Sequence, residues 1–216
     1  MYLVLLGLPG AGKGTHAKNL SDKYNMIHLS SGNIFKNAVK ENTHLGRKVK
    51  KYIHNGELVP DEITIDVMES KIKYHKGEDI IFDGFPRTLN QARELDAFLD
   101  NFNKSIELCI YIEVEENNLI KRLSGRRICN RDGSIYHILF NPPEVDGICD
   151  ECGEKLHQRR DDREEIVKKR IEDNRIKTEK LVEYYKEKGV LEIIEGTGRG
   201  PDDVQEEVDE IVEKYF

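Results

Sequence analysis

The chain has 216 residues, enough for one sizeable hydrophobic core with small inserted modules and too few for several independent domains. Charged residues make up 35% of the sequence and the net charge is −7, which argues against a nucleic-acid partner and favours small ligands bound in a local positive cleft. The apolar start, residues 2–6, is too short for a signal peptide or a membrane span, so we expect a cytoplasmic protein with no membrane partner.

A glycine-rich loop, residues 7–15, follows this apolar run and precedes a segment with helical spacing. Strand, glycine loop and helix in this order are typical of a phosphate site, because the backbone N–H groups converge at the positive end of the helix. A chance glycine-rich loop is the alternative, but the flanking strand and helix disfavour it. The expected ATP-binding residues are Gly10, Ala11, Gly12, Lys13, Gly14 and Thr15, with Lys13 on the β/γ-phosphates and the Thr15 hydroxyl near magnesium.

The next part of the chain alternates apolar strands with amphipathic helices. The expected elements are a strand at 26–30, two short helices between 31 and 60, a helix at 61–75, a strand at 80–83, a helix at 89–99, a strand at 108–112 and a helix at 115–124. Asp83 ends a buried strand, where a carboxylate is costly to bury without a cation or donors. It is a candidate for holding Mg²⁺, the alternative being a helix-capping aspartate.

Residues 125–160 interrupt this alternation with three cysteines, several glycines and the pair Pro142-Pro143. A long charged helix is expected from 161 to 188, then a strand at 190–194, a loop at 196–200 and a closing helix at 202–214. Five strands alternating with helices predict an α/β fold, a doubly wound five-stranded parallel sheet that binds its ligands at the carboxyl ends of the strands.

Arginines cluster at both ends of the insertion and in the turn after Asp83. Phosphoryl transfer needs positive charge spread over the developing oxygens, and guanidinium groups supply it with fixed geometry. The cluster consists of Arg87, Arg122, Arg126, Arg127, Arg159, Arg160 and Arg170, of which Arg127 and Arg160 could equally be ordinary surface charges.

The insertion contains the same five-residue turn twice, CNRDG at 129–133 and CDECG at 149–153. Each turn places two metal-ligand side chains three residues apart with a glycine next, so Asp132 takes the place of a fourth cysteine. We therefore expect a structural Zn²⁺ held by Cys129, Asp132, Cys149 and Cys152. Free cysteines, or His137 or His157 as the fourth ligand, are the alternatives, and Cys109 reads as a core residue.

Several motifs together carry a resemblance to a known family. They are GLPGAGKGT at 7–15, DGFPRT at 83–88 with Gln91, GRR at 125–127, YH at 136–137, FNPP at 140–143 and RRDD at 159–162. In this order over essentially the whole chain they resemble adenylate kinase, in the variant with a long zinc-bearing lid.

The resemblance implies roles for individual positions. ATP would be bound by the glycine loop with Arg122, Arg126, Tyr136, Gly198 and Arg199, and AMP by Ser31, Lys36, Leu58, Val59, Gly84, Arg87, Gln91, Arg159 and Arg170. The catalytic residues would be Lys13, Arg87, Arg126, Arg159 and Arg170, with Thr15 and Asp83 at magnesium and Asp161 and Asp162 positioning the lid arginines. The sequence departs from the family at two positions: Lys36 stands where the family has arginine, and Asn33 where it has aspartate. A lysine is a point charge that cannot grip two phosphate oxygens as an arginine does.

The resulting expectation is a three-part monomeric enzyme. Its core comprises residues 1–29, 60–124 and 160–216, its monophosphate-binding module residues 30–59 and its lid residues 125–159. It would catalyse Mg-ATP + AMP ⇌ 2 ADP by direct in-line transfer under a closing lid, and so balance adenine nucleotides. A UMP/CMP kinase, a GTP-using AMP kinase and an NTP-dependent nucleic-acid-binding module are the alternatives.

Overall fold

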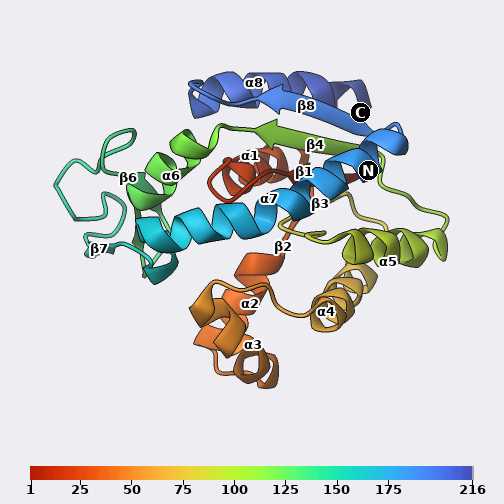
Figure 1. Cartoon of the computed structure of the whole chain (residues 1–216), viewed down its shortest axis with the longest axis horizontal. Helices are drawn as coiled ribbons and strands as arrows, with labels where there is room; N and C mark the ends of the chain where they lie inside the picture. The colour runs from red at the N-terminus through yellow and green to blue at the C-terminus, as the bar shows by residue number, and fades with distance from the viewer. Residues whose placement is uncertain (216) are drawn as a thin grey trace.

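A five-stranded parallel sheet forms the centre of the protein in a computed structural model that describes residues 1–215 (Figure 1). Its strands are β1 (Tyr2–Leu6), β2 (Ile27–Ser30), β3 (Ile80–Asp83), β4 (Leu108–Glu113) and β8 (Leu191–Glu195), in the spatial order β2-β3-β1-β4-β8. β1 is the central strand, and it pairs with β3 on one side and with β4 on the other. The direction in which successive strands are added to the sheet therefore reverses at β1. This topology confirms the predicted doubly wound fold and places a ligand site at the carboxyl end of β1.

Helices cover both faces of the sheet. Their bounds are α1 (Lys13–Tyr24), α4 (Asp61–Tyr74), α5 (Leu89–Asp100), α6 (Glu116–Ser124), α7 (Glu164–Glu187) and α8 (Pro201–Val212). Side chains of β1 alternate between two cores, because successive residues of a strand point to opposite faces. Leu3 and Leu5 pack with α1, α6 and α8, whereas Val4 and Leu6 pack with α4 and α5. The long helix α7 contributes its first half to one core and its second half to the other.

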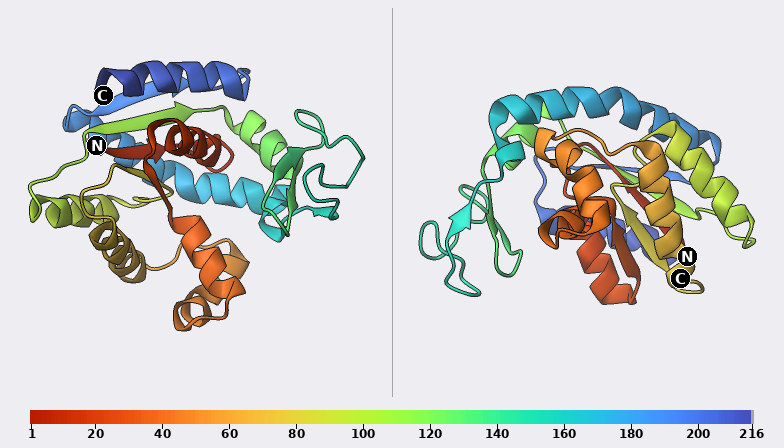
Figure 2. Two further views of the ribbon diagram at one scale, coloured as in Figure 1. Left: turned by 180° about the vertical axis from the view of Figure 1, so that it is seen from behind. Right: turned by 90° about the horizontal axis from the view of Figure 1, so that it is seen from below.

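Two short helices, α2 (Ser31–Lys40) and α3 (His44–Asn55), form a unit below the sheet (Figures 1 and 2). Phe35, Val49 and Val59 make its own small apolar cluster. The two helices approach so closely that a Cβ on Gly46 would lie 1.9 Å from the carbonyl oxygen of Ala38. Only glycine fits at that position. The two short helices predicted between residues 31 and 60 are thus confirmed, and they pack tightly against each other.

The insertion between α6 and α7 projects from the other end of the sheet (Figure 2). It contains a three-stranded antiparallel sheet of β5 (Arg126–Cys129), β6 (Ile135–His137) and β7 (Leu156–His157), in the order β6-β5-β7. Sequence periodicity did not predict these strands, because strands of two to four residues are too short to show alternation. At its base, a Cβ on Gly125 would lie 2.2 Å from Nε2 of His137, so the ring packs directly on the backbone.

The long helix was predicted to start at Asp161, but α7 starts at Glu164 and is preceded by a short 3-10 helix, η1 (Arg160–Asp162). Arg163 is extended, with φ −68° and ψ 138°, and separates the two helices. A second 3-10 turn, η2 (Glu213–Tyr215), follows α8. No helix within residues 1–215 is both long enough and apolar enough to cross a membrane.

Candidate active site

The glycine loop runs from the carboxyl end of β1 to Lys13, where α1 begins. Gly10 and Gly12 have φ angles of 92° and 98°, in the left-handed region that side chains rarely adopt. Gly12 is the N-cap of α1, and no side chain caps the helix. Thr15 and His16 donate their N–H groups to the Gly12 carbonyl oxygen, at 2.9 and 3.2 Å, so the N–H groups left for an anion at the positive end of the helix are those of Lys13 and Gly14.

Lys13 folds back over the loop, donating from Nζ to the carbonyl oxygens of Gly7 at 2.7 Å and Leu8 at 3.1 Å. Burial lowers the pKa of Lys13 to about 8, against the charge of Asp83, which acts in the opposite direction. Arg87 and Arg170 are close enough to lower it further. Lys13 forms no ion pair within residues 1–215, and the phosphates of a nucleotide would add negative charge beside it.

Asp83 lies at the carboxyl end of β3, directly beside this loop. Its Oδ2 lies 3.2 Å from Nε2 of His28 on β2, and about as close to where a Cβ on Gly14 would stand. Burial alone would raise the pKa of Asp83, but the hydrogen bond to His28 and the charge of Lys13 lower it. Asp83 is thus an ionised carboxylate and not a helix cap, which suits a divalent cation. Thr15, its expected partner at magnesium, is exposed on the first turn of α1.

A cleft between α2, the end of α3 and the turn after β3 contains six of the nine positions expected to hold AMP, whereas Lys36, Arg159 and Arg170 are not part of its lining. Its lining includes Ser31, Leu58, Val59, Gly84, Arg87 and Gln91. The Ser31 hydroxyl and Arg87 Nε both donate to the carbonyl oxygen of Gly84, at 2.6 and 2.7 Å. Burial lowers the pKa of Arg87, while the charge of Asp83 opposes that effect. The guanidinium is thereby fixed at the bottom of the cleft.

Gln91, expected to read the adenine of AMP, is buried with both ends of its amide engaged. Its Oε1 accepts from the backbone N–H of Arg87 at 2.7 Å, and its Nε2 donates to Asp61 Oδ1 at 2.7 Å. Asp61 also accepts from the hydroxyl of Thr88, the N-cap of α5, at 2.7 Å. Asp61 was not predicted as a site residue, because an acidic residue in the first turn of a helix is ordinary in a sequence.

The arginines at the ends of the insertion are held by two aspartates of η1. Arg126 binds Asp162 through two parallel hydrogen bonds of 2.8 and 2.6 Å, and Asp162 is completely buried. Arg159 pairs in the same two-point manner with Asp161. Arg170, from α7, donates to the Asp161 carbonyl oxygen at 2.7 Å and lies 3.2 Å from its carboxylate. Asp161 and Asp162 thus hold the three guanidinium groups in fixed orientations, in which they could bind an anion.

Lys36 projects from α2 toward the same group of cations. Burial lowers its pKa to about 8, and Arg159, Arg126 and Arg170 act in the same direction while Asp161 opposes them. The lysine is therefore within electrostatic reach of the three arginines although it comes from a different unit of the fold. Asn33, the other departure from the family pattern, is exposed on α2. Arg160 is also exposed, in keeping with an ordinary surface charge.

On the opposite side of the glycine loop, Arg122 of α6 donates from Nη2 to the carbonyl oxygens of Gly196 at 3.0 Å and Arg199 at 3.3 Å. This brings the loop after β8, with Gly198, next to α6, as expected for an adenine site. Tyr136 differs from expectation, because its hydroxyl lies 3.5 Å from Cys149 Sγ and its ring is buried in the insertion. The Tyr136 side chain is therefore packed against the cysteines of the insertion.

The four expected metal ligands meet at one point of the insertion. One ligand atom from each of Cys129, Asp132, Cys149 and Cys152 lies within 4.8 Å of all the others. The two turns have the same hydrogen bonds, since each glycine N–H donates to the first cysteine's carbonyl oxygen, at 3.1 Å for Gly133 and 2.9 Å for Gly153. Three thiols and a carboxylate that lie this close together form a ligand set that fits Zn²⁺.

The other carboxylate oxygen of Asp132 accepts the N–H of Ser134 at 2.8 Å, which fixes the side chain from the far side. His137 is not part of this group, because its Nδ1 accepts the N–H groups of Leu139 and Phe140 and its Nε2 lies 3.1 Å from the Lys121 carbonyl oxygen. His157 also lies outside the set of four. Cys109 is buried on β4, away from the insertion.

Comparison with known proteins agrees with this arrangement. A family model described as "Adenylate kinase" matches residues 5–190. Similar curated proteins, each named "Adenylate kinase", include one from Acetivibrio thermocellus, 47% identical over 96% of both chains. Another from Oceanobacillus iheyensis is 43% identical over 99% of this chain and 100% of its own. A third from Lachnospira eligens is 48% identical over 91% of this chain and 93% of its own.

Proposed function

The chain belongs to the adenylate kinase family and is an ATP:AMP phosphotransferase, and we propose that the cations between its core and its insertion carry out that transfer. The reaction converts Mg-ATP and AMP reversibly into two ADP and so balances adenine nucleotides. The observation that carries the proposal is the grouping of Lys13, Arg87 and Arg170 near the end of β1, around the ionised Asp83.

ATP binds with its phosphates in the loop from Gly10 to Thr15, and Lys13 reaches the β- and γ-phosphates. The adenine lies between Arg122 and the loop containing Gly198 and Arg199, which the Arg122 hydrogen bonds hold together. The backbone of Tyr136, in the insertion, covers the ATP on the side of the lid. Bound phosphate adds to the charge of Asp83 in stabilising the protonated, buried Lys13.

AMP binds in the cleft beside Arg87, with Lys36 also on its phosphate. The base of AMP lies against Leu58 and Val59 and forms hydrogen bonds with Gln91. Asp61 holds the amide of Gln91 in place for this contact. Ser31 and Gly84 shape the floor of the cleft through their mutual hydrogen bond. The two phosphates then face each other across the carboxyl ends of β1 and β3, in line for direct transfer without a phosphoenzyme.

The arginines complete the site by changing partners. Arg126, Arg159 and Arg170 exchange part of their pairing with Asp161 and Asp162 for the oxygens of the transferring phosphoryl group. Guanidinium groups positioned beforehand stabilise the charge that develops in the transition state. Mg²⁺, held by Asp83 and Thr15, would neutralise negative charge on the β- and γ-phosphates.

We also propose how the parts move. Residues 30–59 form the monophosphate-binding module and residues 125–159 the lid, and both close on a core made of 1–29, 60–124 and 160–216. Closure excludes water, which would otherwise accept the phosphoryl group. The enzyme works as a monomer on free nucleotides in the cytoplasm, where its four unpaired cysteines remain reduced.

The lid holds a structural Zn²⁺ through Cys129, Asp132, Cys149 and Cys152. All four positions are filled by the protein, so the metal stabilises the lid and takes no part in transfer. The matched turns around Gly133 and Gly153 support this, because both present their ligands with the same backbone geometry.

Replacing Lys13 by Ala tests the proposal. We expect turnover to fall by about a hundredfold or more, since the side chain stabilises charge on the transferring group. The melting temperature should change little, because Lys13 makes only two hydrogen bonds to its own loop. Undiminished turnover would refute the assignment of this loop.

A further inference from the structure

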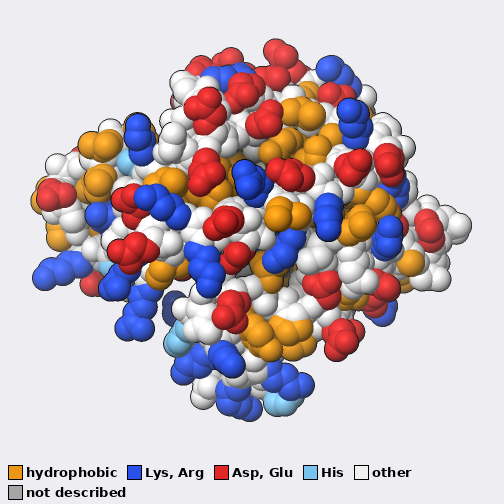
Figure 3. Space-filling model, viewed as in Figure 1, with side chains coloured by type: hydrophobic (Ala, Val, Ile, Leu, Met, Phe, Trp, Pro, Cys, Tyr) orange, Lys and Arg blue, Asp and Glu red, His pale blue; other side chains and the backbone are white. Residues whose placement is uncertain are grey.

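The exposed side of α3 is formed almost entirely by basic residues. The exposed residues of the helix are His44, Arg47, Lys48, Lys50, Lys51, His54 and Asn55, so only one of them is not basic. The opposite side is apolar and packs on α2 through Val49 and its neighbours. Figure 3 shows the resulting group of blue and pale-blue side chains at the end of the molecule formed by α2 and α3.

This basic face is not neutralised by neighbouring acids. Residues 30–59 contain six lysines and arginines against two glutamates, in a chain whose net charge is −7. None of these residues takes part in an ion pair within the described chain. The unit of α2 and α3 is therefore a positive region on an otherwise acidic protein.

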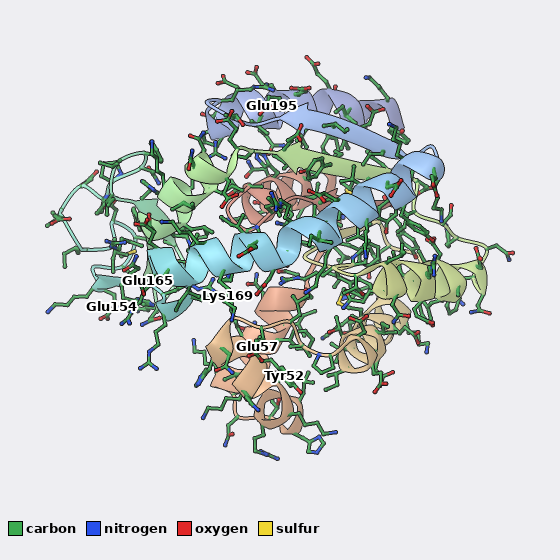
Figure 4. The ribbon with its side chains drawn as sticks, viewed as in Figure 1. Tyr52, Glu57, Glu154, Glu165, Lys169 and Glu195 are labelled. Carbon is green, nitrogen blue, oxygen red and sulfur yellow. The ribbon has the colours of Figure 1, made fainter. Side chains whose placement is uncertain are left out.

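The same helix borders the AMP cleft. Ile53, on its apolar side, and Glu57 and Leu58, just beyond its end, line the cleft. Figure 4 shows Glu57 on the side of the unit that faces α7. A helix with its side chains is about 10–12 Å across, so the basic face lies roughly that far from the cleft. At physiological ionic strength the Debye length is about 8 Å, and at 0.01 M it is about 30 Å.

We propose that the basic face of α3, namely Arg47, Lys48, Lys50 and Lys51, is an electrostatic guide that attracts the AMP dianion to its cleft. The phosphate of AMP is doubly charged at neutral pH, because its second pKa is about 6. The net negative charge of the protein repels such an anion, and a local positive field reverses that effect at one entrance. The inference rests on the proposed function, since it assumes that AMP enters this cleft.

A polynucleotide partner fits this face less well. The aromatic residue of α3, Tyr52, is half-buried against the apolar cluster and offers no surface on which bases could stack. The acidic remainder of the chain would also repel a long polyanion, whereas a mononucleotide meets only the local field.

The test is the pair of double variants K48E/K51E and K48Q/K51Q. At about 0.01 M ionic strength we expect K48E/K51E to lower kcat/KM for AMP about three- to tenfold, with kcat nearly unchanged. K48Q/K51Q should give about half of that effect on a logarithmic scale, because it changes the charge of each residue by one unit and K48E/K51E changes it by two. At about 0.5 M salt both effects should disappear, and kcat/KM for ATP should change much less at either salt concentration.

The matched control is K180E/K186E, which alters the net charge equally through two exposed lysines in the second half of α7. The C-terminal end of this helix lies away from α3 (Figure 1). If the control lowers kcat/KM for AMP as much as K48E/K51E does, net charge and not the α3 face is responsible. An unchanged kcat/KM for AMP at low salt, in enzyme that still transfers phosphoryl groups to AMP, would also overturn the inference. Loss of transfer to AMP in the unmodified enzyme would instead refute the proposed function.

Discussion

Replacing Lys36 by Arg should change how AMP use depends on pH. Burial holds the pKa of Lys36 at about 8, so the lysine loses its charge as the pH rises through that value. At about pH 9 only about one lysine in eleven remains charged, which lowers kcat/KM for AMP roughly tenfold through this residue alone. Arginine stays charged and can grip two phosphate oxygens, so the variant should bind AMP more tightly and avoid that loss.

The assay is a pH profile of kcat/KM for each substrate, since this ratio reports the ionisation of the free enzyme. Lys13 also has a pKa of about 8, so kcat/KM for ATP should fall above pH 8 equally in both proteins. Lys40→Arg, at an exposed position of the same helix, is the control and should leave both profiles unchanged. If Lys36→Arg leaves the pH profile of kcat/KM for AMP unchanged, or alters the profile for ATP, Lys36 does not contact the phosphate of AMP as proposed.

Other predictions follow from single contacts. Cys149→Ser should lose the lid zinc and lower the melting temperature while the core still binds ATP, whereas Asp132→Cys should keep the metal; zinc-free purified protein would contradict both. Asp162→Asn leaves the Arg126 guanidinium, 21% exposed, without its counter-charge, and should cost about 3 kcal/mol of stability, or roughly 6–12 °C in melting temperature. An unchanged melting temperature would mean that Arg126 finds another acid. Gly46→Ala forces a Cβ to 1.9 Å from the Ala38 carbonyl oxygen, and the strain of about 1–3 kcal/mol should raise KM for AMP and not for ATP.

The sheet and its ligand edge were predictable because they depend on local patterns. The apolar runs at β1, β3 and β4 are too continuous to be surface segments, and the glycine loop can only follow the first of them. The positions of Lys13, in the glycine loop, and of Asp83, at the end of a buried strand, on one edge of the sheet were predictable for the same reason. The convergence of Cys129, Asp132, Cys149 and Cys152 was predictable because one five-residue turn occurs twice.

What the sequence did not reveal depends on contacts between distant residues. His28 gives no signal of its own, and its contact with Asp83 arises only because β2 and β3 pair in register. Asp61 reaches Gln91 from a helix thirty residues away in sequence. The Tyr136 hydroxyl lies beside Cys149 because the strand of Tyr136 is fixed by its pairing with β5.

The most direct test of the account is phosphoryl transfer from Mg-ATP by the purified enzyme to AMP, GMP, CMP and UMP, compared as kcat/KM in one coupled assay. A cleft that holds the base through Gln91, Leu58 and Val59 should prefer AMP by about a hundredfold or more, because Arg87 and Asp61 fix the orientation of the Gln91 amide and a base with a different pattern of donors and acceptors does not match it. Two ADP should form for each ATP and AMP consumed. Equal use of UMP or CMP, or phosphate release without ADP formed from AMP, would contradict the account.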